Sequence, residues 1–96
     1  MSQEYLVHFS SKITDEIIAE VIRSINEKIS LSVVSDDGKS LWIPSSNPLW
    51  IDFSIEENEG GLFVVSNLNG CENSEIFSLI EKTLGSHGVA YVIEDV

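Results

Sequence analysis

Basic residues are scarce in this chain. Five Lys and Arg accompany 16 Asp and Glu among 96 residues, which gives a formal net charge of −11 at pH 7. The shortage is greatest after residue 43, where Lys82 is the only basic residue and the net charge is −8. A field of this sign repels nucleic acid and anionic lipid and attracts basic molecules. We therefore expect a basic partner, no nucleic acid and no membrane.

Cysteine and long apolar runs are also lacking. Cys71 is the only cysteine, which excludes an internal disulfide and a four-cysteine zinc site. No apolar stretch approaches the length of a membrane span, and the first residues show no secretory signal, so we expect a cytosolic protein. With 43% hydrophobic residues, six Gly and two Pro, the composition is that of one globular domain spanning residues 1–96.

Hydrophobic periodicity predicts two helices. The first covers residues 14–28, with Thr14 as N-cap and one apolar stripe formed by Ile17, Ile18, Val21, Ile22 and Ile25. The second follows Asn73 or Ser74 as N-cap and ends at Gly85, with its inward residues being Ile76, Phe77, Ile80 and Leu84.

Alternation and short apolar runs predict six strands, at residues 5–9, 31–34, 41–43, 49–55, 62–66 and 89–93. Residues 36–39 form a hairpin turn, because Asp-Gly supplies the positive φ angles of a tight turn. Residues 56–61 form a polar turn, and residues 67–71 form a loop. Pro44 and Pro48 cannot donate ladder hydrogen bonds, so we expect an irregularity there.

The predicted order is β-α-β-β-β-β-α-β. It indicates an α+β fold, a two-layer sandwich in which two helices cover a mainly antiparallel sheet and strands from both ends of the chain pair. This arrangement is a ferredoxin-like variant, with an extra strand or kinked hairpin inserted into the split βαβ plan.

Residues suited to catalysis are few and have no context that pairs them. Cys71 would need a histidine and an orienting group to act as a nucleophile. We expect instead that Cys71 is partly buried at the start of a helix. His8 is expected on the less covered face of the sheet, and His87 at an exposed loop tip. No enzyme activity is predicted.

No cofactor or metal site is predicted either. Glu56, Glu57 and Glu59 do not have the spacing of an EF-hand calcium loop. Gly60-Gly61 and Gly85 belong to no phosphate-binding motif, and the surrounding charge opposes phosphate.

The two tryptophans are the most informative side chains. By strict alternation Trp50 and Asp52 lie on the outer face of their strand, and the opposite phase faces the helices with Leu49, Ile51, Phe53 and Ile55. Exposed aromatics among carboxylates are typical of a contact with a basic protein. The alternatives are that both tryptophans fill the core and that the acidic residues only keep the protein soluble.

These observations predict a partner-binding surface. Its central residues are Trp50, Asp52, Glu56, Glu57 and Glu59, and its rim consists of Trp42, Asp36 and Asp37.

A small acidic α+β chain without a catalytic set resembles bacterial toxin-immunity proteins, in particular those of contact-dependent growth inhibition systems. The resemblance lies in size, charge and layout, and it assigns no residue. It implies 1:1 binding to one cognate toxin domain, often a basic nuclease, and inhibition at or beside the active site of that toxin. The rival interpretation is a regulatory or structural module that dimerises or binds a small ligand.

Overall fold

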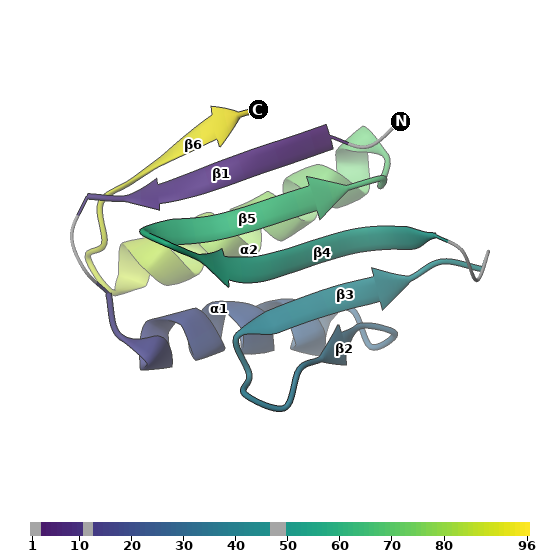
Figure 1. Cartoon of the computed structure of the whole chain (residues 1–96), viewed down its shortest axis with the longest axis horizontal. Coiled ribbons are helices and arrows are strands. Elements are labelled where there is room, and N and C mark those ends of the chain that lie inside the picture. Colours follow the sequence, from purple (N-terminus) through teal and green to yellow (C-terminus); the bar gives the residue numbers. More distant parts are fainter. Residues whose placement is uncertain (1–2, 11–12, 47–49) are drawn as a thin grey trace.

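The computed structural model describes residues 3–10, 13–46 and 50–96. Two helices lie together on one face of a six-stranded sheet (Figure 1). In chain order the elements are β1 (Gln3–Phe9), α1 (Asp15–Lys28), β2 (Val33–Val34), β3 (Ser40–Pro44), β4 (Ile51–Asn58), β5 (Gly61–Ser66), α2 (Gly70–Ser86) and β6 (Tyr91–Asp95). The predicted α+β class and element order are confirmed.

The sheet is antiparallel at every pair of neighbours, in the order β2-β3-β4-β5-β1-β6. Strand β5 lies between β1 and β4, and β1 lies between β5 and β6, which is the split βαβ arrangement of ferredoxin-like folds. The hairpin β2–β3 extends this sheet beyond β4 and is the inserted unit that the sequence predicts. Strands β1 and β6 pair as expected.

One core fills the space between the helices and the sheet. Each of its residues is exposed by 7% or less: Val7, Ile18, Val21, Ile22, Ile25, Leu41, Ile43, Phe53, Ile55, Leu62, Val64, Ile76, Ile80 and Leu84. At the margin the rings of Tyr5 and Phe77 meet edge to face, with centroids 4.9 Å apart. Burial of this kind stabilises by about 1.5–3 kcal/mol for each large apolar side chain. Neither helix in the described ranges is long and apolar enough to cross a membrane.

Helix α1 begins where predicted, because the Thr14 hydroxyl accepts a hydrogen bond from the backbone N–H of Ile17. The predicted start of α2 is wrong. Its N-cap is Asn69, whose side chain accepts from the Glu72 N–H at 2.9 Å while the Glu72 carboxylate accepts from the Asn69 amide at 2.6 Å. This reciprocal cap outweighs the weak helix propensity of Gly70.

The predicted stop of α2 at Gly85 is wrong as well. The helix continues to Ser86, and the residue in the left-handed region is Gly88, with φ +68°. The Val89 N–H bonds to the Leu84 carbonyl and the Gly88 N–H to the Gly85 carbonyl, both at 3.0 Å. These two bonds form a Schellman motif, which requires the glycine one residue beyond the helix cap.

Several strand ends differ from the prediction; β2 begins at Val33 and not at residue 31, and β6 is Tyr91–Asp95 and not 89–93. Strand β4 continues to Asn58, so the turn is only Glu59–Gly60, with Gly60 at φ +78°. Ile43 pairs with Phe53 but Pro44 pairs with Ile51, so β4 carries one extra residue, Asp52. The bulge lies beside Pro44, whereas the inserted hairpin expected around Pro44 and Pro48 is β2–β3, which turns before Pro44. Pro48 and Leu49 lie outside the described residues.

Candidate functional site

The face of the sheet opposite the helices is uncovered (Figure 1). Strand register places two rows of outward side chains across it. The first row is Val33, Trp42, Ser54, Val65 and Glu4, and the second is Ser40, Glu56, Phe63, Leu6 and Glu94. We call this surface the open face and define it by the apolar Leu6, Trp42, Phe63 and Val65 and by the carboxylates Glu4, Glu56 and Glu94 beside them.

Leu6, Phe63 and Val65 are apolar neighbours on β1 and β5, and Trp42 lies on β3, beyond Ser54 and Glu56 of β4. All four apolar side chains are half-buried, and no second layer of described residues covers them. At the two edges of the sheet, Val33 and Val92 are 41% and 62% exposed. Apolar and aromatic residues gathered in this way form the kind of patch that monomeric proteins present to partners.

Carboxylates lie beside these apolar side chains. Glu56 lies directly opposite Phe63 across the strand pair, and Glu4 lies opposite Val65. Glu94 contacts His8 at 3.0 Å, and both side chains are about half exposed or more. The arrangement offers aromatic contact area flanked by negative charge.

Trp42 and Glu56 are the two predicted residues that the open face brings together. Trp42 is half-buried and points away from the core, since it alternates with the buried Leu41 and Ile43. Glu56 follows the buried Ile55 in the same way. The alternative that Trp42 fills the core is wrong.

Asp52 does not lie on the outer face of β4 that the alternation predicts for Trp50 and Asp52. Trp50 precedes β4 and is 56% exposed, so it does not fill the core either. The bulge breaks the alternation on which the prediction relied. Ile51, expected to face the helices, is 49% exposed, whereas Asp52 lines a hollow with Lys28 and Leu68 from the helix side.

Glu57 and Glu59 lie at the far end of β4 from Trp50. Eight residues of strand separate the two ends, which corresponds to about 26 Å. Glu57 pairs with the buried Leu62 and points to the helix side, where it lines a cleft with Ile18 of α1. Glu56 and Glu57 are therefore neighbours in sequence on opposite faces of the sheet.

Asp36 and Asp37 lie in the turn between β2 and β3. The Asp37 carboxylate accepts hydrogen bonds from the Ser35 hydroxyl at 2.6 Å and from the Lys39 N–H at 3.0 Å. These two bonds, the Ser35 bond first, lower the pKa of Asp37. Its charge is thus already engaged in holding the turn, together with Gly38 at φ +72°.

The Lys39 ammonium contacts the Asp15 carboxylate of α1 at 3.0 Å. This contact raises the pKa of Lys39, and the nearby Glu57 raises it further. The turn between β2 and β3 therefore lies against the start of α1 and near Glu57.

The residues considered for catalysis do not converge. His8 lies on the open face, and His87 follows α2 and contacts Glu20 of α1. Cys71 lies at the other end of α2, about 24 Å from His87 along the helix axis. Cys71 is exposed, so its predicted partial burial is wrong. Across the described ranges, no three His, Cys, Asp or Glu side chains are placed to hold a metal ion.

Sequence reasoning missed three apolar residues of the open face. Leu6, Phe63 and Val65 lie in predicted strands but are absent from the predicted partner-binding surface. The sequence feature that could have identified them is that consecutive residues of the strand are apolar. Leu62 and Val64 point to the core, while Phe63 and Val65 point away from it. A strand with apolar residues in both phases indicates two apolar faces.

A comparison of the chain with protein-family models, curated proteins and solved structures found no match.

Proposed function

We propose that this protein binds a basic protein through its open face and thereby neutralises a cognate toxin domain. One observation carries the proposal: within the described residues the helices cover one side of a six-stranded sheet, and the other side presents Trp42, Phe63 and further apolar side chains next to carboxylates. Large aromatic side chains supply most of the free energy of protein interfaces, and flanking charges steer the encounter.

Charge complementarity selects the partner. In a face-to-face dimer each copy of this chain would carry a net charge of −11. The resulting repulsion opposes self-association through the open face. A basic protein would gain from the same field at long range. This supports a heterologous 1:1 complex over the rival interpretation of a dimerising module.

The toxin class follows from the resemblance to immunity proteins in size, charge and layout. A nuclease active site attracts phosphates, so it also attracts carboxylates such as Glu56. Under this proposal the protein acts in the cytosol, where it binds the toxin before the toxin reaches nucleic acid.

The area of the open face suggests that the contact extends beyond it. Six strands about 4.8 Å apart, two to eight residues long with about 3.3 Å per residue, present a projected area on the order of 500 Å². A specific interface covers about 800 Å² on each partner. Residues at the ends of the sheet, such as Trp50, are therefore expected to contribute.

Affinity capture from the native host at low salt, followed by mass spectrometry, tests the proposal. We expect a basic protein that stops growth when expressed alone and no longer does so when this chain is co-expressed. An unrelated toxin should not be neutralised. Sedimentation of the pure protein as a stable dimer, with no such partner captured, would support the rival module instead.

A further inference from the structure

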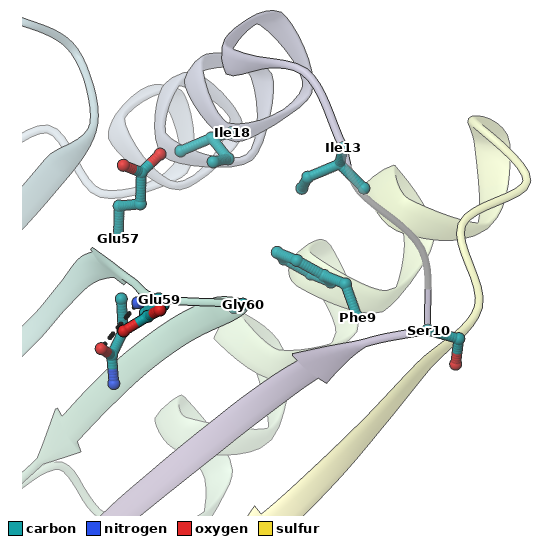
Figure 2. A pocket seen from close by; sticks show the side chains of 9 residues that line it. Phe9, Ser10, Ile13, Ile18, Glu57, Glu59 and Gly60 are labelled. Carbon is teal, nitrogen blue, oxygen red and sulfur yellow. Dashed lines mark hydrogen bonds between the residues drawn. The ribbon is translucent and has the colours of Figure 1, made fainter.

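A cleft opens between the β4–β5 turn, the end of β1 and the start of α1. Its volume is about 500 Å³, which suits a long side chain or a small ligand. Figure 2 shows Phe9 and Ile13 along one wall, and Ile18 with the Glu57 carboxylate along the other. We call it the turn cleft and define it by these four residues.

Backbone contacts fix the position of the β4–β5 turn at the edge of the cleft. A side chain at Gly61 would place its Cβ only 1.8 Å from the Val7 carbonyl oxygen, so only glycine allows β5 to begin this close to β1. The Phe9 N–H then bonds to the Gly60 carbonyl at 3.1 Å. The turn is thus fixed against the end of β1, with the Phe9 ring beside it.

The Glu57 carboxylate has no hydrogen-bond or ion-pair partner within the described residues. The nearby ammonium of Lys39 is paired with Asp15 instead, at 3.0 Å. Glu57 acts on Lys39 only through its field, which helps to raise the pKa of Lys39. Glu59 adds a second negative charge where the turn borders the cleft.

The cleft therefore combines apolar walls with an unpaired negative charge. An anion would be repelled, and a purely apolar group would cover a carboxylate without pairing it. Lysine and arginine side chains combine an aliphatic stem with a cationic head and fit both features. The Phe9 ring can also contact the cation through its π face.

We infer that the turn cleft receives a lysine or arginine side chain of the basic partner. The stem packs against Phe9 and Ile13 on one wall, and the cationic head donates a hydrogen bond to Glu57 on the other. This inference rests on the proposed function for its partner. It places a second contact at one end of the sheet, outside the open face.

A titration with n-butylammonium, followed by amide NMR, tests the chemistry of the cleft without the partner. We expect binding with a dissociation constant on the order of 10 mM and shifts at Phe9, Ile18 and Gly60. Methylammonium, which lacks the stem, and 1-butanol, which lacks the charge, should each bind about tenfold more weakly because each retains only half of the contacts.

Two matched variants isolate Glu57. Glu57→Gln should weaken n-butylammonium binding about tenfold because it removes the charge while keeping the shape. Glu56→Gln removes the same charge one residue away, on the opposite face, and should leave this binding unchanged. Equal binding by wild type and Glu57→Gln, or shifts on the open face instead, would overturn the inference.

The captured partner provides the second arm. Glu57→Gln should lower its affinity about tenfold, and millimolar n-butylammonium should compete with it. If the partner binds but neither change has an effect, the inference about the cleft fails and the proposed function stands. If n-butylammonium occupies the cleft but no basic partner exists, the proposed function fails instead.

Discussion

The two faces of the sheet are made by the same strands and differ in what covers them. On the helix side, Val7, Phe53 and Leu62 are fully buried. On the open face, Leu6 directly precedes Val7 in β1, and Phe63 directly follows Leu62 in β5. Both side chains point away from the core and remain half-buried. A sheet with water on one face usually shows polar residues there. The half-buried apolar residues of the open face are the basis for our proposal that a partner forms the second layer there.

The largest expected effect compares two phenylalanines on opposite faces. Phe53→Ala should lower the free energy of unfolding by about 3–5 kcal/mol because it leaves a cavity in the core. Phe63→Ala should cost about 1–2 kcal/mol, since its side chain is half in water already. Urea unfolding of both variants measures the difference. Equal losses of unfolding free energy in the two variants would mean that the open face is covered in the free protein.

For partner binding, in contrast to stability, the largest loss of free energy is expected from a substitution on the open face. Trp42→Ala should weaken partner binding by about 2–4 kcal/mol, because Trp42 is a large aromatic side chain that the open face presents between two neighbouring strands. Trp50→Ala, at the end of β4, should cost less, and Glu94→Ala at the border should cost under about 1 kcal/mol. Calorimetry on folded variants gives these values. If Trp50→Ala has the largest effect, the contact is centred at the end of the sheet.

Salt should act on the rate of association. Between low and high ionic strength the association rate constant should fall about tenfold, while dissociation changes little, because exposed carboxylates steer the encounter over distances that salt screens. Stopped-flow mixing measures both rates. A flat response would assign the acidic residues to solubility alone.

The smallest expected effect concerns Asp37 in the β2–β3 turn. Its pKa is lowered in the folded state, so its contribution to stability is present above the unfolded pKa of about 3.9 and is lost as the pH falls through the folded pKa. Asp37→Asn should therefore lower the melting temperature slightly at pH 7, and by less at pH 2 than at pH 7.

Asp36→Asn is the matched control for Asp37. Within the described residues the Asp36 side chain makes no hydrogen bond, so its replacement should not change the melting temperature at either pH. An equal effect of both variants would show that net charge, and not the hydrogen bonds from Ser35 and Lys39, governs the turn.

The fold could be predicted from sequence because local signals agreed with it. The stripe of α1, the Thr14 cap and the Asp-Gly turn each specify their own geometry. The start of α2 was missed because Gly70 and Cys71 are poor helix residues, and the decisive cap pair, Asn69 and Glu72, acts through side-chain geometry.

The candidate surface was harder to predict. The prediction relies on unbroken inward–outward alternation of side chains along β4. The extra residue Asp52 breaks this alternation, so Ile51 points outward instead of toward the helices. Glu56, Glu57 and Glu59 look like one acidic cluster in sequence, yet β4 continues through the first two and sends them to opposite faces. The partner role of all eight predicted residues stays a prediction.

A growth assay tests the central claim most directly. Cells that express the captured basic toxin are supplied with wild-type protein, the Trp42→Ala/Phe63→Ala double variant, or Leu31→Ala, which removes a side chain that is 78% exposed in the connection between α1 and β2. Circular dichroism first confirms that each variant is folded. The wild type and Leu31→Ala should restore growth and the double variant should not. Full rescue by the double variant would contradict the assignment of the open face.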